Sequence, residues 1–212
     1  MPLEFRKRVI VSEFESPFEN FKPVKVSGEI RCCLLSGHVT RILPVRLKDF
    51  ARIDWSPVVA RSRESGCPFC PGALELKTPR FPAAYALETG RIRVGGATVF
   101  PNAFPYDEHC AVVVFTGEHY LSPGQFTPEM LADGFAASQI YFQTAGRVVP
   151  LARQAAVNWN YMPLAGAGIV HPHLQTALLP EMTAYYRTVC ERQARYAAER
   201  GGSLFDDLVA RE

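Results

Sequence analysis

One apolar run constrains the fold of this chain more than any other segment. Residues Cys110 to Phe115 read Cys-Ala-Val-Val-Val-Phe, without a polar break. A strand with one face in water alternates apolar and polar side chains, so an unbroken run indicates a strand buried on both faces. Such a strand needs cover on each side of its sheet. We therefore predict an α+β protein, an antiparallel β-sheet with packed helices.

The remaining predicted elements agree with this class. Turn residues separate short strands at residues 29–35, 39–43, 91–94, 97–100 and 156–161. Helices are predicted at about 127–146, where Thr127 is the N-cap, at about 181–200, which stops at Gly201-Gly202, and at 204–211, which Ser203 caps. Residues 50–66 have no regular pattern and predict a long irregular link.

Length and charge limit the classes of partner. The 212 residues predict a single domain, 1–212, in which residues 1–25 form an extended arm or a short hairpin. The net charge of +2 is too small to favour nucleic acid or an anionic membrane as a partner. No apolar run approaches transmembrane length, and the start of the chain lacks a signal-peptide core. We therefore expect a cytoplasmic protein.

Two of the six cysteines have a spacing typical of metal sites. Cys67 and Cys70 form Cys-Pro-Phe-Cys-Pro-Gly, a tight knuckle rather than the start of a helix, which suits metal better than redox chemistry. Zinc prefers four nitrogen or sulfur ligands, so two must come from elsewhere. We take His119 and His171, and His109 competes for the third position. The alternative is a partly buried thiol pair beside a loop histidine.

A second pattern follows a glycine-containing loop. In Ala-Gly-Ala-Gly-Ile-Val-His-Pro-His-Leu-Gln, residues 165–175, two histidines and a glutamine occupy alternate positions. In an extended strand His171, His173 and Gln175 line one face, and Leu174 faces the other way. The loop glycines permit close approach of a ligand to backbone N–H groups, which can bind an anion.

This arrangement is suited to attack on phosphorus. Imidazole is a neutral nucleophile near pH 7, and attack on a phosphate would leave a phosphoramidate that can pass the group onward. The transition state needs N–H donors for its oxygens. Candidate donors are Gln175, the amides of residues 166–168 and Arg46. The alternative for Gln175 is an ordinary surface or inter-strand hydrogen bond.

Five segments in order resemble one family. His171-Pro-His-Leu-Gln175 resembles the His-Pro-His-x-Gln signature of galactose-1-phosphate uridylyltransferases, in the histidine-triad superfamily. The cysteine knuckle, the Phe-Pro-Asn-Ala-Phe turn at 100–104, the Phe-Thr-Gly-Glu-His end at 115–119 and the Arg-containing strand at 41–46 are similar to further family motifs. The resemblance spans residues 39 to 180 and implies a histidine-triad-like half-domain.

The resemblance implies a role for each matching residue. His173 would take a nucleoside monophosphate from a nucleotide sugar and form a nucleotidyl-histidine. A sugar 1-phosphate would then accept the nucleoside monophosphate. This is an enzyme activity of carbohydrate and galactose metabolism. Zinc, or iron, would be held by four ligands, with His119 as the third: Cys67, Cys70, His119 and His171. Gln175 would hold phosphoryl oxygens, and the substrate-binding set would be Arg46, Phe69, Phe100, Asn102, Phe104, Val112, Asn160, Gly166 and Gly168.

The chain departs from the family in three ways. Gly168 stands where the family has a serine, which removes a hydroxyl donor, and Leu174 replaces a usual glycine, which implies a tighter or more apolar acceptor pocket. The family's second half-domain is absent, so the chain is a fragment, a natural half-length form, or one that a partner chain completes in a homodimer. Alternative functions are ADP-sugar or dinucleoside polyphosphate phosphorylase or hydrolase, and a zinc-stabilised nucleotide-binding module without turnover.

Overall fold

The computed structural model describes residues 5–44, 53–151 and 154–211. Length alone predicts one domain, whereas the contacts within the chain group it into two compact units. Unit 1 comprises Met1–Arg52 with Met182–Glu212, and unit 2 comprises Ile53–Glu181. The two segments of unit 1 therefore come from the two ends of the sequence, and unit 2 is continuous.

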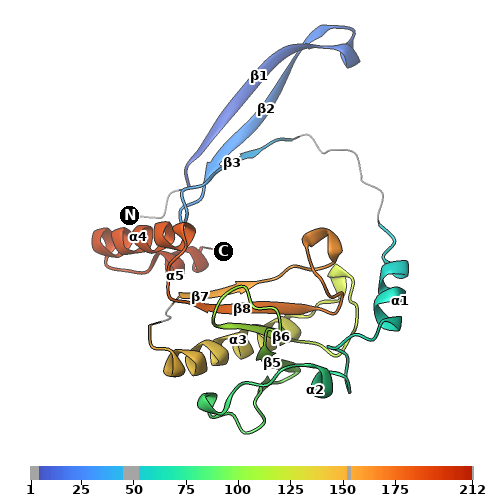
Figure 1. Ribbon diagram of the computed structural model, residues 1–212. Coiled ribbons are helices and arrows are strands. Elements are labelled where there is room, and N and C mark those ends of the chain that lie inside the picture. The colour runs from blue at the N-terminus through green and yellow to red at the C-terminus, as the bar shows by residue number, and fades with distance from the viewer. Residues whose placement is uncertain (1–4, 45–52, 152–153, 212) are drawn as a thin grey trace. The chain divides into compact units, whose positions relative to one another are not determined.

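Unit 1 contains a three-stranded antiparallel sheet and two helices (Figure 1). Its sheet has the order β1 (Lys7–Ser16), β2 (Lys22–Cys32) and β3 (Val39–Ile42), and a short 3-10 turn η1 (Pro17–Glu19) joins the first two strands. The helices are α4 (Ala184–Arg200) and α5 (Leu204–Val209). Of the two alternatives for the first 25 residues, the structure has the hairpin. The strands predicted at 29–35 and 39–43 correspond to the end of β2 and to β3, which pair with one another.

Unit 2 contains a five-stranded antiparallel sheet in the order β4-β5-β6-β8-β7. Its helix α3 runs along the sheet (Figure 1) and contacts β4, β5, β6 and β8. In chain order the elements are α1 (Ser56–Glu64), α2 (Leu74–Lys77), η2 (Ala83–Tyr85), β4 (Ile92–Val94), β5 (Ala97–Pro101), β6 (Cys110–Val114), η3 (Pro123–Gln125), α3 (Pro128–Val148), β7 (Gln154–Asn158), η4 (Pro163–Ala165) and β8 (His173–Leu179). The predicted α+β class and antiparallel sheet are confirmed.

The apolar run forms β6, and both of its faces are buried as predicted. Ala111, Val113 and Phe115 pack with buried residues of α3, among them Tyr141, in one core cluster. Val112 and Val114 face the other way, into a second cluster that includes Cys67, Phe69 and Phe100. One face of the sheet is thus covered by a helix and the other by the cysteine knuckle.

The register of β8 decides on which face the histidine motif lies. Gln175 is paired with Val112, and His173 with Val114, so both side chains share the face of the knuckle. Leu174 is fully buried in the cluster on the α3 side. The expectation that Leu174 narrows an acceptor pocket is therefore wrong, because strand alternation directs its side chain into the helix-covered core.

Two predicted boundaries differ from the structure. The link at 50–66 contains the helix α1, which buries none of its residues and so has no apolar periodicity to reveal it. Its start has local signals, since the Asp54 carboxylate accepts a hydrogen bond from the Ser56 amide and Pro57 lies in the first turn. The strand predicted at 156–161 is β7, which ends at Asn158. Within the described ranges no helix combines the length and apolarity needed to cross a membrane.

Candidate active site and metal centre

Four side chains meet where the cysteine knuckle covers the sheet. One ligand atom from each of Cys67, Cys70, His119 and His171 lies within 4.8 Å of the others. The cysteines lie between α1 and α2, His119 follows β6, and His171 precedes β8. The rival ligand His109 lies just before β6, and its ring faces Glu108 at 3.8 Å. The structure thus brings together the four residues predicted from the sequence, and His109 is not among them.

Backbone contacts orient the ligands of this cluster. His171 Nε2 lies 2.8 Å from the Thr116 carbonyl oxygen, which can only accept, so Nε2 carries the proton and Nδ1 keeps its lone pair. The Nδ1 atoms of His171 and His119 lie 3.7 and 3.2 Å from Cys70 Sγ. The Phe69 amide also points at Cys67 Sγ, at 3.4 Å. Such outer contacts are typical of metal sites, where they fix the tautomer of each ligating imidazole.

The electrostatics of the cluster suit a cation. Burial is the largest cause that raises the pKa of the Cys70 thiol to about 11, and the neighbouring Cys67 raises it further. Burial likewise lowers the pKa of His171 to about 4 and lowers that of His119. Without a metal the Cys70 thiol and the two imidazoles are therefore neutral at pH 7. Two sulfur and two nitrogen donors fit a divalent metal, which would displace the thiol protons.

A cavity of about 390 Å³ lies beside the cluster on the same face of the sheet. Its volume is within the range of small-molecule sites, roughly 300–1,000 Å³. Eight of the predicted catalytic and substrate-binding residues line it: Phe69, Phe100, Asn102, Phe104, Val112, Gly168, His173 and Gln175. The buried rings of Phe69 and Phe100 provide apolar surface at 5.5 Å from one another.

His173 is the nucleophile candidate within this cavity. Its Nδ1 lies 2.7 Å from the His171 carbonyl oxygen and therefore carries the proton, which leaves the lone pair on Nε2. The Phe69 ring meets the imidazole edge-on at 5.2 Å. Burial lowers the pKa of His173, and the bond to the His171 carbonyl offsets part of that effect. A neutral imidazole with a free Nε2 is the form that attacks an electrophile.

Two predicted residues lie outside this cavity. Asn160 and Gly166 are exposed and do not line the cavity. They are neighbours in the loop after β7, where a Cβ on Gly166 would lie 3.8 Å from Asn160 Nδ2. Asn160 follows the end of β7, so strand pairing does not direct it toward the cavity. The predicted phosphate ligand Arg46 lies outside the described residues.

The cavity also contains residues that the sequence did not single out. Lys77, at the end of α2, supplies a cation, and Tyr106 supplies a phenol whose oxygen lies 3.4 Å from Asn158 Nδ2. A lysine at the end of a short helix and a tyrosine in a loop belong to no recognised motif. The one sequence signal for Lys77 is that it lies seven residues after Cys70, close in sequence to the cysteine knuckle.

Comparison with known proteins places these observations in context. No profile of a described protein family matches the sequence. An uncharacterised protein of Archaeoglobus fulgidus is 30% identical over 190 residues, which cover 87% of this chain and 53% of that protein. An ADP-glucose phosphorylase from Arabidopsis thaliana, solved with bound ADP-glucose, matches 82% of this chain and 56% of its own, with a TM-score of 0.54 and 17% identity.

A second Arabidopsis thaliana structure, described as a GalT-like protein, matches 81% of this chain and 54% of its own, with a TM-score of 0.51 and 17% identity. The chain thus spans about half the length of the relatives that it matches. At these identities the structures establish the fold. The chain therefore has, over about half their length, the fold of these two Arabidopsis thaliana proteins, the ADP-glucose phosphorylase and the GalT-like protein.

Proposed function

We propose that this protein is a nucleotidyltransferase that carries a nucleoside monophosphate on His173, between a nucleotide sugar and a sugar 1-phosphate. One observation carries the proposal. The His171 carbonyl holds the His173 proton on Nδ1, which leaves Nε2 unprotonated in a cavity of suitable size. A histidine with only a structural role would not need a lone pair facing a ligand cavity.

The proposed reaction has two steps. His173 Nε2 attacks the α-phosphorus of the nucleotide sugar, a nitrogen–phosphorus bond forms, and the bond to the bridging oxygen breaks, so that a sugar 1-phosphate leaves. The phosphate oxygen of a second sugar 1-phosphate then attacks the same phosphorus, and the bond to nitrogen breaks. The imidazole returns to its neutral form without a net change in protons.

Several cavity residues would assist these steps. The Gln175 amide lies one strand repeat from His173 on the same face and can donate to a non-bridging oxygen. Lys77 adds positive charge for the transferred phosphoryl group. The apolar rings of Phe69 and Phe100 suit a flat base, and Asn102 supplies an amide. Neither surface distinguishes uracil from adenine.

The metal would have a structural role. Cys67, Cys70, His119 and His171 would hold zinc, or iron, in a closed four-ligand site with no position left for substrate. The bound ion would supply rigidity, because it would join the knuckle to the strand that carries the nucleophile. His171 serves both sites: its ring faces the cysteines, and its carbonyl orients His173.

Covalent labelling tests the proposal. The protein is incubated with UDP-glucose or ADP-glucose radiolabelled at the α-phosphorus, and the labelled protein is then exposed to acid. We expect acid-labile label on the wild type and on His38→Ala, since His38 is exposed and lies in unit 1. We expect none on His173→Ala. Equal labelling of all three proteins, or of none, would contradict the covalent mechanism.

The acceptor then separates the candidate activities. Sugar 1-phosphate would release the label as a nucleotide sugar, and inorganic phosphate would release it as a nucleoside diphosphate. The likeness to an ADP-glucose phosphorylase favours phosphorolysis as the second candidate. Release to water alone would identify a hydrolase. Tight binding of the nucleotide sugar by calorimetry, without label, would identify a binding module.

A further inference from the structure

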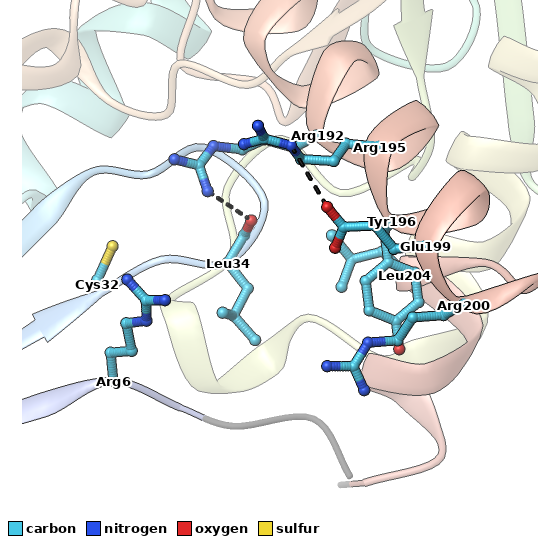
Figure 2. A pocket seen from close by; sticks show the side chains of 9 residues that line it. All are labelled: Arg6, Cys32, Leu34, Arg192, Arg195, Tyr196, Glu199, Arg200 and Leu204. Atoms are coloured by element: carbon cyan, nitrogen blue, oxygen red, sulfur yellow. Dashed lines mark hydrogen bonds and ion pairs between the residues drawn. The ribbon is translucent and has the colours of Figure 1, made fainter. Parts of the chain in front are cut away.

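Unit 1 has a hollow of about 380 Å³ that the proposed reaction does not use. One wall is the chain around β2, with Arg6, Cys32 and Leu34, and the other is α4 with the start of α5. Figure 2 shows these side chains around the hollow, with the arginines on more than one side of it. The site is therefore independent of the His173 cavity, which belongs to unit 2.

The helical wall is cationic because of its residue spacing. Side chains three or four positions apart share one face of a helix. In α4 this face carries Arg192, Arg195, Tyr196, Glu199 and Arg200, all of which line the hollow. Among the residues that the structure describes, four guanidinium groups, including that of Arg6, and the carboxylate of Glu199 thus line the hollow.

Local contacts hold three of these arginines in place. Arg192 Nη1 donates to the Leu34 carbonyl oxygen at 3.4 Å (Figure 2). The guanidinium also lies on the Gly37 turn, where φ is +74° and a Cβ would come within 2.3 Å of Arg192 Nη2. A side chain at residue 37 is therefore disfavoured by the backbone of the turn, and it would also displace the end of the Arg192 side chain.

The other two arginines are oriented within α4 itself. Arg195 is paired with Glu199 at 3.6 Å, one helical turn away (Figure 2). The guanidinium of Arg200 lies 5.4 Å from the centre of the Tyr196 ring, and the Tyr196 hydroxyl donates to Asp207. A guanidinium has five N–H donors, so the contacts of Arg192 and Arg195 leave donors on both groups for a ligand.

We propose that this hollow is a second ligand site, which binds a small molecule through a diphosphate group. Guanidinium groups recognise phosphate oxygens in pairs, and a diphosphate presents oxygens on two phosphorus atoms to arginines on different walls. The source is either free pyrophosphate or the diphosphate of a nucleotide conjugate, and both share this chemistry.

Calorimetry with the full chain tests the site, with inorganic pyrophosphate as the probe. We expect binding of one equivalent in His173→Ala, where the other cavity has lost its nucleophile but unit 1 is intact. In that background Arg192→Gln and Arg6→Gln should each weaken binding at least tenfold, about the worth of one charge-assisted contact. Arg187→Gln is the matched control, since Arg187 is exposed on the same helix outside the hollow, and should bind within twofold.

Two further measurements identify the ligand. Because these arginines are exposed, binding should weaken as salt increases. Tighter binding of UDP-glucose or ADP-glucose than of pyrophosphate, when it is weakened by Arg192→Gln, would assign the nucleotide conjugate, and the reverse order of affinities would assign free pyrophosphate. Either result supports the site, provided that the arginine side-chain NH resonances of the wild type shift with the probe.

Four outcomes would overturn the proposal. One is the lack of both heat and resonance shifts at millimolar pyrophosphate. Another is equal binding of inorganic phosphate, which would remove the diphosphate requirement. A third is an equal loss in Arg187→Gln, which would indicate only general attraction to a basic helix. The last is tighter binding of a DNA duplex with the same arginine dependence, which would assign a nucleic acid instead.

Discussion

Replacement of Leu174 by alanine tests whether loss of core packing lowers stability without a change in the chemistry of the neighbouring cavity. Leu174 is fully buried against the α3-facing cluster, while its neighbours in sequence, His173 and Gln175, face the cavity. Loss of three side-chain carbons costs about 2–2.5 kcal/mol in transfer free energy. A residual cavity adds about 1–2 kcal/mol, because Gly134 on α3, whose Cβ would lie 3.4 Å from Leu174, has no side chain to fill it.

The expected loss in unfolding free energy is therefore about 3–4.5 kcal/mol, or roughly 10 °C in the midpoint of thermal unfolding. Urea denaturation followed by tryptophan fluorescence measures it. Both tryptophans, Trp55 and Trp159, lie in unit 2, and Trp159 packs against Phe115 of the same core at 5.6 Å. The control is Leu164→Ala, whose side chain is 77% exposed and which should change stability by less than about 0.5 kcal/mol.

The same variant tests the direction of the side chain. Covalent labelling per folded molecule should equal that of the wild type, because Leu174 does not line the cavity. A loss below about 1 kcal/mol would refute the packing argument. Full stability with altered acceptor preference would place Leu174 in the cavity after all, and would refute the register of β8.

Three further predictions concern single side chains. Gly168→Ser should increase the rate of covalent labelling, because the added hydroxyl would be a hydrogen-bond donor in the cavity of the proposed nucleophile. The side chain fits, since a Cβ at residue 168 meets no atom within 4 Å. A slower rate would contradict this reasoning. Cys70→Ser should reduce bound zinc or iron to less than half an equivalent by elemental analysis, whereas the exposed Cys190→Ser should retain it. A hydrogen bond from Ser36 lowers the pKa of the exposed Cys33. Alkylation of Cys33 by iodoacetamide, followed by mass spectrometry, should therefore reach its full rate at a lower pH in the wild type than in Ser36→Ala. Identical pH profiles of the two proteins would refute that cause.

Local sequence signals predicted most elements of this chain. Thr127 caps α3 through the Met130 amide, and Gly201 ends α4 in the left-handed conformation, both as expected. The unbroken run at 110–115 correctly indicated a strand covered on both faces. These features succeed because each is determined by residues within a few positions of one another.

Other features depend on packing that no single segment encodes. The sequence contains no signal for two units, because unit 1 joins the start of the chain to residues after 182. The choice of His119 over His109 rests on which end of β6 meets the knuckle, which spacing alone leaves open. Lys77 enters the cavity through α2, a four-residue helix too short to show periodicity.

The position of β8 has a consequence for the order of folding. Among the strands of unit 2 it is the last in sequence, yet it lies between β6 and β7 and pairs with both. During synthesis the earlier strands must wait with unpaired edges until residues 173–179 leave the ribosome. Because that strand begins with His173, the residues that complete the sheet also bring in the proposed nucleophile. Intermediates that lack β8 would therefore be prone to aggregate and, under the proposed mechanism, unable to accept the nucleotidyl group.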